Sequence, residues 1–305
     1  MIHNKLGAAG AAVLMSIASS ITASAQSAQG PMPTAELFRD IETKYVFGFT
    51  EGSGIGLEGE KEISVDTQAR IGKSGGRYFA SESKLEFEFT PNQYIQIEFG
   101  PFVSAHDISN VTDLDDRRQI AFGGFFGEIR AMLLDRGPSS PLALTLSAEP
   151  EWRRIDETSG ERVNNVELEL KLNGDVELVP KRFYFGFNLL YEPEATHDPD
   201  RVGAGWEQES KFGVSGALSY RILPSTLIGF EAWYLRHYEG AWLNTFTGDA
   251  VYIGPTLFMQ LNRKMFLAAA WNMQVTGRDL ENPGAALNLS EFSRHRAKLK
   301  LAVEF

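Results

Sequence analysis

Apolar and polar residues alternate along most of the chain after residue 60. In a β-strand successive side chains point to opposite faces, so this two-residue period predicts strands with one apolar and one polar face. The clearest case sets the apolar residues Val166, Leu168, Leu170 and Leu172 against Glu167, Glu169, Lys171 and Asn173. A sheet built from such strands would present one face to an apolar environment and the other to charge.

Twelve segments carry this pattern. They span residues 60–71, 78–89, 94–104, 119–134, 142–153, 163–178, 182–192, 207–220, 226–237, 250–261, 265–275 and 293–305. Several match the 9 to 11 residues, or a little more, that a tilted membrane strand needs. The apolar run 45–49 precedes them, and if it also pairs, a further short segment must pair and the count becomes fourteen. We expect twelve.

The last strand carries a recognisable motif. Ala297, Leu299, Leu301, Val303 and Phe305 share one face, and Arg296, Lys298, Lys300 and Glu304 share the other. A strand that ends the chain leaves an open sheet edge unless it pairs with another strand, and closing a barrel would remove that edge. This ten-residue alternation ending in Phe resembles the closing strand of bacterial outer-membrane β-barrel proteins. The resemblance implies an all-β, antiparallel, up-and-down transmembrane barrel, with Leu299, Leu301, Val303 and Phe305 as its assembly signal.

The connections between strands support the same class. Outer-membrane barrels alternate short periplasmic turns with longer external loops. Short turns occur at 90–93, 179–181, 222–225 and 262–264, with a medium one at 135–141. Longer polar stretches alternate with them at 105–118, 155–162, 193–206, 239–249 and 276–292. With an even number of strands, the first and last strands both have their chain ends on the periplasmic side.

The N-terminal region resembles a secretory signal. Lys5 precedes the uncharged run 6–21, and Ala23-Ser24-Ala25 forms an A-x-A cleavage site, so we expect residues 1–25 to be removed. A short membrane anchor is the alternative. Residues 26–43 are expected to be a periplasmic leader or a lumen insert, and residues 44–305 the barrel. The expected location is the outer membrane of a Gram-negative cell, after export through the inner membrane.

Composition excludes several classes of function. The chain holds 29 basic and 40 acidic residues, a net charge of −11, which makes nucleic acid an unsuitable partner. It contains no cysteine, so disulfides and Cys-ligated metals are excluded. The Gly-rich stretch 52–59 lacks the Lys-Ser/Thr ending of a phosphate-binding loop and predicts a turn near the barrel entrance. We expect no cofactor and no metal.

If the apolar rows face lipid, the charged rows face the lumen. The expected lumen-lining residues are Lys84, Glu86, Glu88, Glu98, Glu149, Glu167, Glu169, Lys171, Glu209, Lys211, Glu231, Arg296, Lys298 and Lys300. Acidic walls facing a basic strip on the last strand would favour cations in an open pore. Alternatively, the same residues pair across a narrow barrel and fill it.

Enzymatic alternatives depend on four histidines, at positions 106, 197, 237 and 295. Outer-membrane lipases and deacylases resemble this fold and use Ser with His. The nearest candidates are His197 with Asp198, His106 with Asp107, and Ser290 or Ser293 with His295, and none reproduces a family motif. The acidic stretch Asp107, Asp113, Asp115 and Asp116 lacks the spacing of an EF-hand and predicts a solvated loop.

The sequence therefore predicts a passive channel or porin-like transporter for small polar or charged solutes. Its expected partners are outer-membrane lipids and lipopolysaccharide, the barrel-assembly machinery and the solutes themselves. Two alternatives stay open at this stage: an outer-membrane lipid hydrolase acting at the external loops, and a closed structural or adhesive barrel.

Overall fold

The structure, a computed structural model, describes residues 42–137, 140–201, 203 and 205–305. The expected signal segment and most of the expected leader lie outside these described residues. Among the described residues, no helix is long and apolar enough to cross a membrane.

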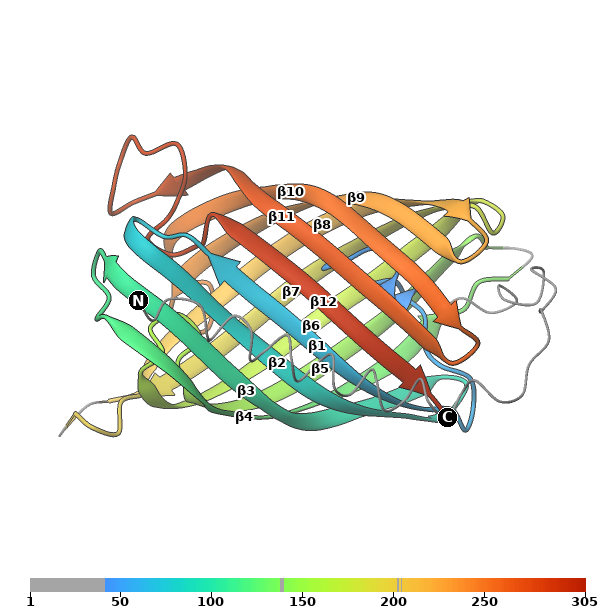
Figure 1. Cartoon of the computed structure of the whole chain (residues 1–305), viewed down its shortest axis with the longest axis horizontal. Coiled ribbons are helices and arrows are strands. Elements are labelled where there is room, and N and C mark those ends of the chain that lie inside the picture. Colours follow the sequence, from blue (N-terminus) through green and yellow to red (C-terminus); the bar gives the residue numbers. More distant parts are fainter. Residues whose placement is uncertain (1–41, 138–139, 202, 204) are drawn as a thin grey trace, which may run out of the picture. The chain divides into compact units, whose positions relative to one another are not determined.

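Twelve antiparallel strands in the described part of the chain form one closed barrel (Figure 1). They are β1 (Lys61–Ile71), β2 (Gly75–Asn92), β3 (Ile95–Val111), β4 (Arg117–Leu134), β5 (Leu142–Ile155), β6 (Arg162–Val179), β7 (Phe183–His197), β8 (Glu207–Leu223), β9 (Thr226–Glu239), β10 (Thr245–Asn262), β11 (Met265–Asp279) and β12 (His295–Glu304). Each strand pairs with its neighbours in the sequence. The predicted all-β, twelve-stranded class is confirmed, and the fourteen-stranded alternative is wrong.

The seam between the first and last strands closes the barrel. β1 pairs with β12 over ten residue pairs, among them Val65 with Leu301, and the Phe305 amide donates to the Lys61 carbonyl at 2.9 Å. Closure pairs the backbone groups that an edge strand would leave open.

The outer surface carries the apolar rows of the strands. Leu85, Phe87 and Phe89 alternate with charged residues that are turned inward, and all three are exposed on the outside of β2. Phe87 stacks on Phe99 of β3 with ring centroids 6.0 Å apart. Exposed apolar rows of this kind on neighbouring strands need an apolar solvent, as the outer face of a membrane barrel does.

Strands extend further than predicted toward one end of the barrel. The sequence ended the third strand at Ser104, the seventh at Glu192 and the eleventh at Val275, whereas ladder pairing continues to Val111, His197 and Asp279. Polar side chains at these strand ends suggested loops, but the backbone there still pairs with its neighbours. The long connections are therefore shorter than expected, and the longest is 280–294.

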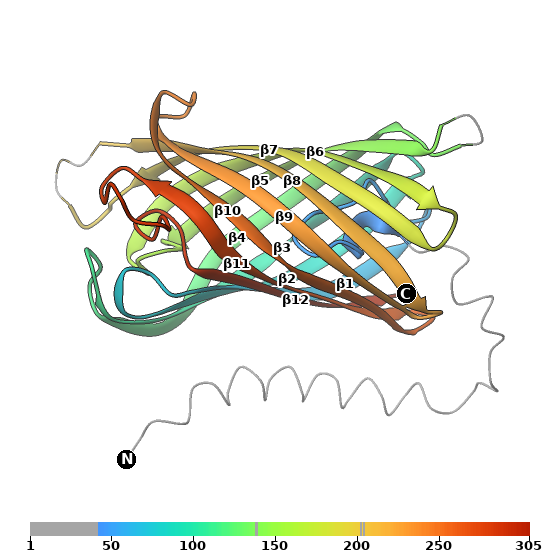
Figure 2. The same cartoon turned by 90° about the horizontal axis from the view of Figure 1, so that it is seen from above.

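Short and long connections lie at opposite ends of the barrel (Figures 1 and 2). The turns 93–94, 180–182, 224–225 and 263–264 lie at one end, together with the longer connection 135–141. We call this the turn end, and the opposite end, with connections such as 198–206 and 280–294, the loop end.

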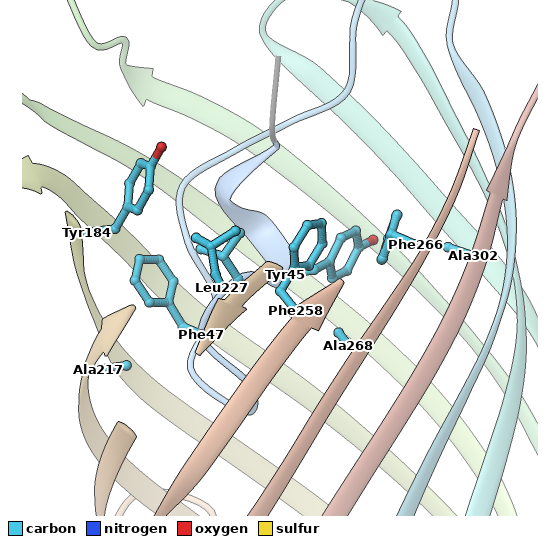
Figure 3. Packing of buried hydrophobic residues seen from close by; sticks show 10 residues of the cluster. Tyr45, Phe47, Tyr184, Ala217, Leu227, Phe258, Phe266, Ala268 and Ala302 are labelled. Carbon is cyan, nitrogen blue, oxygen red and sulfur yellow. The ribbon is translucent and has the colours of Figure 1, made fainter. Parts of the chain in front are cut away.

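Residues 43–53, in the described part of the chain before β1, lie inside the barrel near the turn end (Figure 1). This segment begins with the single 3-10 turn η1 (Thr43–Tyr45) and continues through buried residues. The wall thus starts at Lys61 rather than at residue 44, and the run 45–49, a possible extra strand by sequence, pairs with no strand. Its apolar side chains pack against apolar residues on the lumen side of the wall instead (Figure 3).

Candidate functional site

Residues 43–53, here called the plug, cross the lumen at the turn end and touch the wall from β2 round to β12. The contacts run through Glu88 of β2, Glu98 of β3, Glu128 of β4, Thr145 of β5, Asp175 of β6, Asn188 of β7, Ser215 of β8, Glu231 of β9, Phe258 of β10, Phe266 of β11 and Lys300 of β12. The plug is therefore held against almost the whole circumference of the wall.

Lys44 is the charged centre of the plug. Its Nζ lies 3.1 Å from Glu88, 2.9 Å from Glu98 and 3.5 Å from Glu128, and each of these side chains is at most 7% exposed. The Tyr45 hydroxyl donates to the Glu88 carboxylate at 2.9 Å. A buried charge is tolerated only when it is paired, so the three carboxylates hold the Lys44 ammonium in the lumen against the wall.

Glu231 of β9 binds the backbone of the plug. Its carboxylate accepts the amides of Phe49 at 3.1 Å and Thr50 at 2.7 Å. The Trp233 indole and the Asn272 amide also donate to it, at 3.1 and 2.9 Å. The carboxylate has no exposed surface, and these four donors compensate for its burial.

Asp175 of β6 fastens both ends of the plug. It accepts the Thr43 hydroxyl at 2.7 Å, the Ser53 amide at 2.7 Å and the Ser53 hydroxyl at 2.6 Å, and it also pairs with Arg136. A carboxylate that receives several donors and a guanidinium strongly favours this folded geometry.

Apolar packing adds to the polar contacts. Tyr45, Val46 and Phe47 are almost fully buried, and the Tyr45 ring stacks on Phe266 with centroids 5.0 Å apart (Figure 3). Burying a large apolar side chain contributes roughly 1.5–3 kcal/mol. Gly48 follows with a φ of +93°, where a Cβ would lie 2.6 Å from Thr256 Cγ2. Glycine at this position lets the plug approach the wall closely.

Above the plug, toward the loop end, lies a cavity of about 510 Å³. Phe49 and Glu51 of the plug line it, and Glu51 pairs with Arg130 at 2.5 Å and Lys171 at 3.1 Å. The walls bring both signs of charge to the cavity. Arg296 lies over the Phe49 ring at 4.7 Å and, among the described residues, has no carboxylate within 4.0 Å.

Two loop residues at the cavity rim have shifted pKa values. Burial raises the pKa of Glu157, but Arg70, Lys211 and Arg153 outweigh it and hold that pKa well below its usual value. Burial, with a smaller contribution from Arg70, lowers the pKa of Lys73 to about 8, although Glu291 and Asp156 oppose the shift. At neutral pH the Glu157 carboxylate is therefore ionised and Lys73 is mostly charged.

The residues expected to line the lumen point inward from the wall. Near the plug lie Glu86, Glu88, Glu98, Glu231 and Lys300; around the cavity lie Glu169, Lys171, Glu209, Lys211, Arg296 and Lys298; and Lys84, Glu149 and Glu167 lie on the adjoining wall. Many of them pair, as Lys300 does with Glu86 at 2.5 Å and Lys298 does with Asp66 at 3.2 Å. The lumen thus holds paired charges at the turn end and a polar cavity above them.

Several residues of the site were absent from the sequence-based set. Glu128 and Arg130 lie in the alternating pattern of β4 and could have been found there, since Ile129 between them faces outward. Lys44 and Glu51 lie in a segment without strand periodicity, so nothing in the sequence indicated their position in the lumen.

Large aromatic residues of the second half of the chain divide between the two faces of the barrel. Trp206, Trp242 and Trp271 are exposed. Trp233 and Tyr252 are buried inside the barrel, because their positions in β9 and β10 point inward.

The candidate catalytic pairs do not assemble. The Ser293 hydroxyl donates to the His295 backbone carbonyl at 3.0 Å, while the His295 ring lies on Trp271 with centroids 5.6 Å apart. The His197 ring lies on Trp206 at the same centroid distance. In the acidic stretch, Asp107 pairs with Arg77 at 2.8 Å.

Comparison with known proteins places the chain in a family. Residues 40–305 match the model described as "Family of unknown function (DUF6662)". The chain belongs to this family. No curated protein matches the sequence of this family member.

Solved structures share its fold at low sequence identity. The COG4313 outer membrane channel from Pseudomonas putida F1 is 11% identical, with a TM-score of 0.58, over 82% of this chain and 97% of that one. The NanC porin is 9% identical, with a TM-score of 0.48, over 79% and 98% of the two chains. The translocator domain of the autotransporter NalP from Neisseria meningitidis is 14% identical, with a TM-score of 0.48, over 82% and 90%. The similarity to the first of these, together with the closed twelve-stranded barrel, shows that the family member has the fold of a bacterial outer-membrane barrel.

Proposed function

We propose that this protein is an outer-membrane channel for small polar or charged solutes, closed at rest by its own plug. The observation that carries the proposal is a charged lumen that is crossed at its turn end by a chain segment bound to the wall. The plug is attached to the wall through side chains that can exchange these contacts for water. The fold shared with an outer membrane channel supports the same function.

The direction of the channel follows from its two ends. Outer-membrane barrels place short turns in the periplasm and longer loops outside the cell, so the plug would block the periplasmic end and the cavity would face outward. A solute entering between the loops would reach Phe49 and Glu51 and stop there. Passage then requires the plug to leave its seat.

The cavity defines the kind of solute. Its volume of about 510 Å³ lies within the range of pockets for small molecules. Arg296 and Lys298 on one wall face Glu192 and Glu194 on another across the same cavity. Side chains of both signs favour solutes that carry charge or many hydrogen-bonding groups over apolar ones.

The remaining sequence predictions complete the proposal. The protein would reach the outer membrane after removal of residues 1–25. There the barrel-assembly machinery would recognise the strand with Leu299, Leu301, Val303 and Phe305, and the apolar outer face would contact outer-membrane lipid and lipopolysaccharide.

A disulfide across the plug tests the proposal. The chain has no native cysteine, and the Thr50 and Ser215 hydroxyl oxygens lie 3.0 Å apart between plug and wall. The double variant Thr50→Cys/Ser215→Cys would fix the plug under oxidising conditions. The matched control is Thr67→Cys/Ser83→Cys, whose hydroxyl oxygens lie 2.9 Å apart between β1 and β2 and touch no plug residue.

Single-channel current through the purified protein in a planar bilayer is the measurement. We expect brief openings from the unmodified chain, their loss in the oxidised plug variant and their return on adding dithiothreitol, while the control variant opens in both states. Openings that persist when mass spectrometry shows the crosslink to be complete would contradict a path through the plug. An unmodified barrel that is folded but never opens would favour a closed structural barrel instead.

A further inference from the structure

Glutamates oppose one another in register on four neighbouring strands at the loop end. In the backbone register, Glu167 of β6 lies opposite Glu194 of β7, Glu194 lies opposite Glu209 of β8, and Glu209 lies opposite Glu239 of β9. Like charges directly opposite in a sheet destabilise it unless a cation lies among them. The ammonium of Lys211 lies 3.6 Å from Glu194, but it also pairs with Glu157 and Glu192. The row therefore keeps an excess of negative charge.

A histidine lies beside this row with its ring held in place. His237 Nδ1 is 2.8 Å from the Thr247 hydroxyl and 3.3 Å from the Glu291 carboxylate. Its Nε2 is 3.2 Å from a Glu209 carboxylate oxygen. If Nδ1 carries the proton and donates it to Glu291, the lone pair on Nε2 points at the carboxylates. Metal-binding histidines are oriented by a carboxylate in this way.

We propose that Glu194, Glu209 and His237 bind one divalent transition-metal cation, such as Zn²⁺, at the cavity wall. One ligand atom from each of the three residues lies within 4.8 Å of the other two. A tetrahedral zinc ion with bonds of about 2.0–2.1 Å separates its ligand atoms by about 3.3 Å. The 3.2 Å between Nε2 and the Glu209 oxygen already matches this distance.

The mixed ligand set selects the class of cation. Imidazole nitrogen suits zinc, copper, nickel and iron, whereas Mg²⁺ and Ca²⁺ prefer oxygen ligands alone. Three protein ligands leave a fourth position, and all three residues line the cavity, so water or a solute can occupy it. Metal binding at this wall does not require the plug to move, so the metal site can be tested independently of the proposed channel function.

Calorimetric titration of the tag-free, full-length protein in detergent with ZnCl₂ tests the site, with MgCl₂ as the comparison. We expect the unmodified chain to bind one Zn²⁺. The variant His237→Ala lacks one of the three ligands and should bind Zn²⁺ at least about tenfold more weakly. His197→Ala is the matched control, because its ring lies on Trp206 outside the ligand set, and it should bind as the unmodified chain does.

Glu291→Gln separates orientation of the ring from ligation. It should keep one Zn²⁺ per chain and weaken binding about 10- to 100-fold, as loss of an orienting carboxylate does. Co²⁺ absorption provides a second readout, since visible bands from a tetrahedral site should appear in the unmodified chain and vanish in His237→Ala. Absence of Zn²⁺ binding by the folded protein, equal binding of Mg²⁺, or unchanged binding in His237→Ala would each overturn the proposal.

Discussion

Replacing Lys44 by Met tests how the plug is held. The substitution keeps most of the side-chain volume and removes the charge that pairs with Glu88, Glu98 and Glu128. With the plug seated, the three carboxylates would lie buried without their cation. With the plug displaced, the same carboxylates would face water in the lumen. The substitution therefore penalises the closed state far more than the open one.

The size of the effect follows from the burial of these groups. Removing one partner of a buried ion pair costs about 3–5 kcal/mol, and 1.4 kcal/mol corresponds to a tenfold change in an equilibrium. If only the closed state bears this cost, the ratio of open to closed molecules rises by about 100- to 4,000-fold. Protonation of one carboxylate would relieve part of the repulsion, so we expect the lower end, about 100-fold.

The assay is the open probability of single channels, measured for Lys44→Met and the unmodified chain at the same voltage. Lys84→Met is the matched control. Lys84 pairs with Glu149 at 2.5 Å and Glu151 at 2.9 Å across the wall, and no contact between it and the plug occurs in the described structure. It should alter conductance only slightly and leave open probability near that of the unmodified chain.

Two results would refute this reasoning. One is an unchanged open probability in Lys44→Met while heat-dependent gel mobility shows a folded barrel, because the ion pairs would then contribute nothing to closure. The other is an equal rise of the open probability in Lys84→Met, because the loss of any lumen charge would then have the same effect, whether or not that charge contacts the plug.

Two further predictions concern the plug backbone and the cavity rim. Gly48→Ala should raise the open probability more than Gly59→Ala. Both positions have a positive φ, but a Cβ at Gly48 would lie 2.6 Å from Thr256 Cγ2, whereas nothing lies within 4 Å of a Cβ at Gly59. Equal effects of the two substitutions would show that backbone strain alone is responsible. Since burial lowers the pKa of Lys73 to about 8, the rim loses positive charge as the pH rises from 7 to 9. Cation preference, read from reversal potentials in a salt gradient, should increase over that range in the unmodified chain and not in Lys73→Met.

The barrel could be predicted because its surroundings impose a period on the sequence. A strand between lipid and a polar lumen must alternate, and residues such as Leu168 and Glu169 show this directly. The ends of the strands were harder to predict. Backbone pairing in β3 continues through His106 and Asp107, whose polarity suggested a loop.

The plug could not be predicted because it has no period and its partners are remote in the sequence. Phe49 binds a carboxylate 182 positions away, and the apolar run around it looks the same whether it forms a strand or a buried turn. The ion pairs inside the lumen could not be predicted either, because the stagger of the strands in the closed barrel decides which carboxylate lies beside which basic side chain. His237 was expected at the end of the strand 226–237, and only the register of β8 and β9 brings it to Glu209.

The connection between the plug and β1 has a consequence for how the channel would reset. Residues 54–60 join the two, and their turn is fixed by the Gly59 amide on the Thr90 carbonyl at 2.8 Å and the Glu60 amide on the Leu57 carbonyl at 2.9 Å. A displaced plug therefore remains tethered beside its own seat, at an effective concentration on the order of millimolar for a short linker. A free peptide of the same sequence would have to reach a similar concentration to compete with it. In the proposed channel, reclosure would thus be a unimolecular event, whose rate is independent of how many copies the membrane holds.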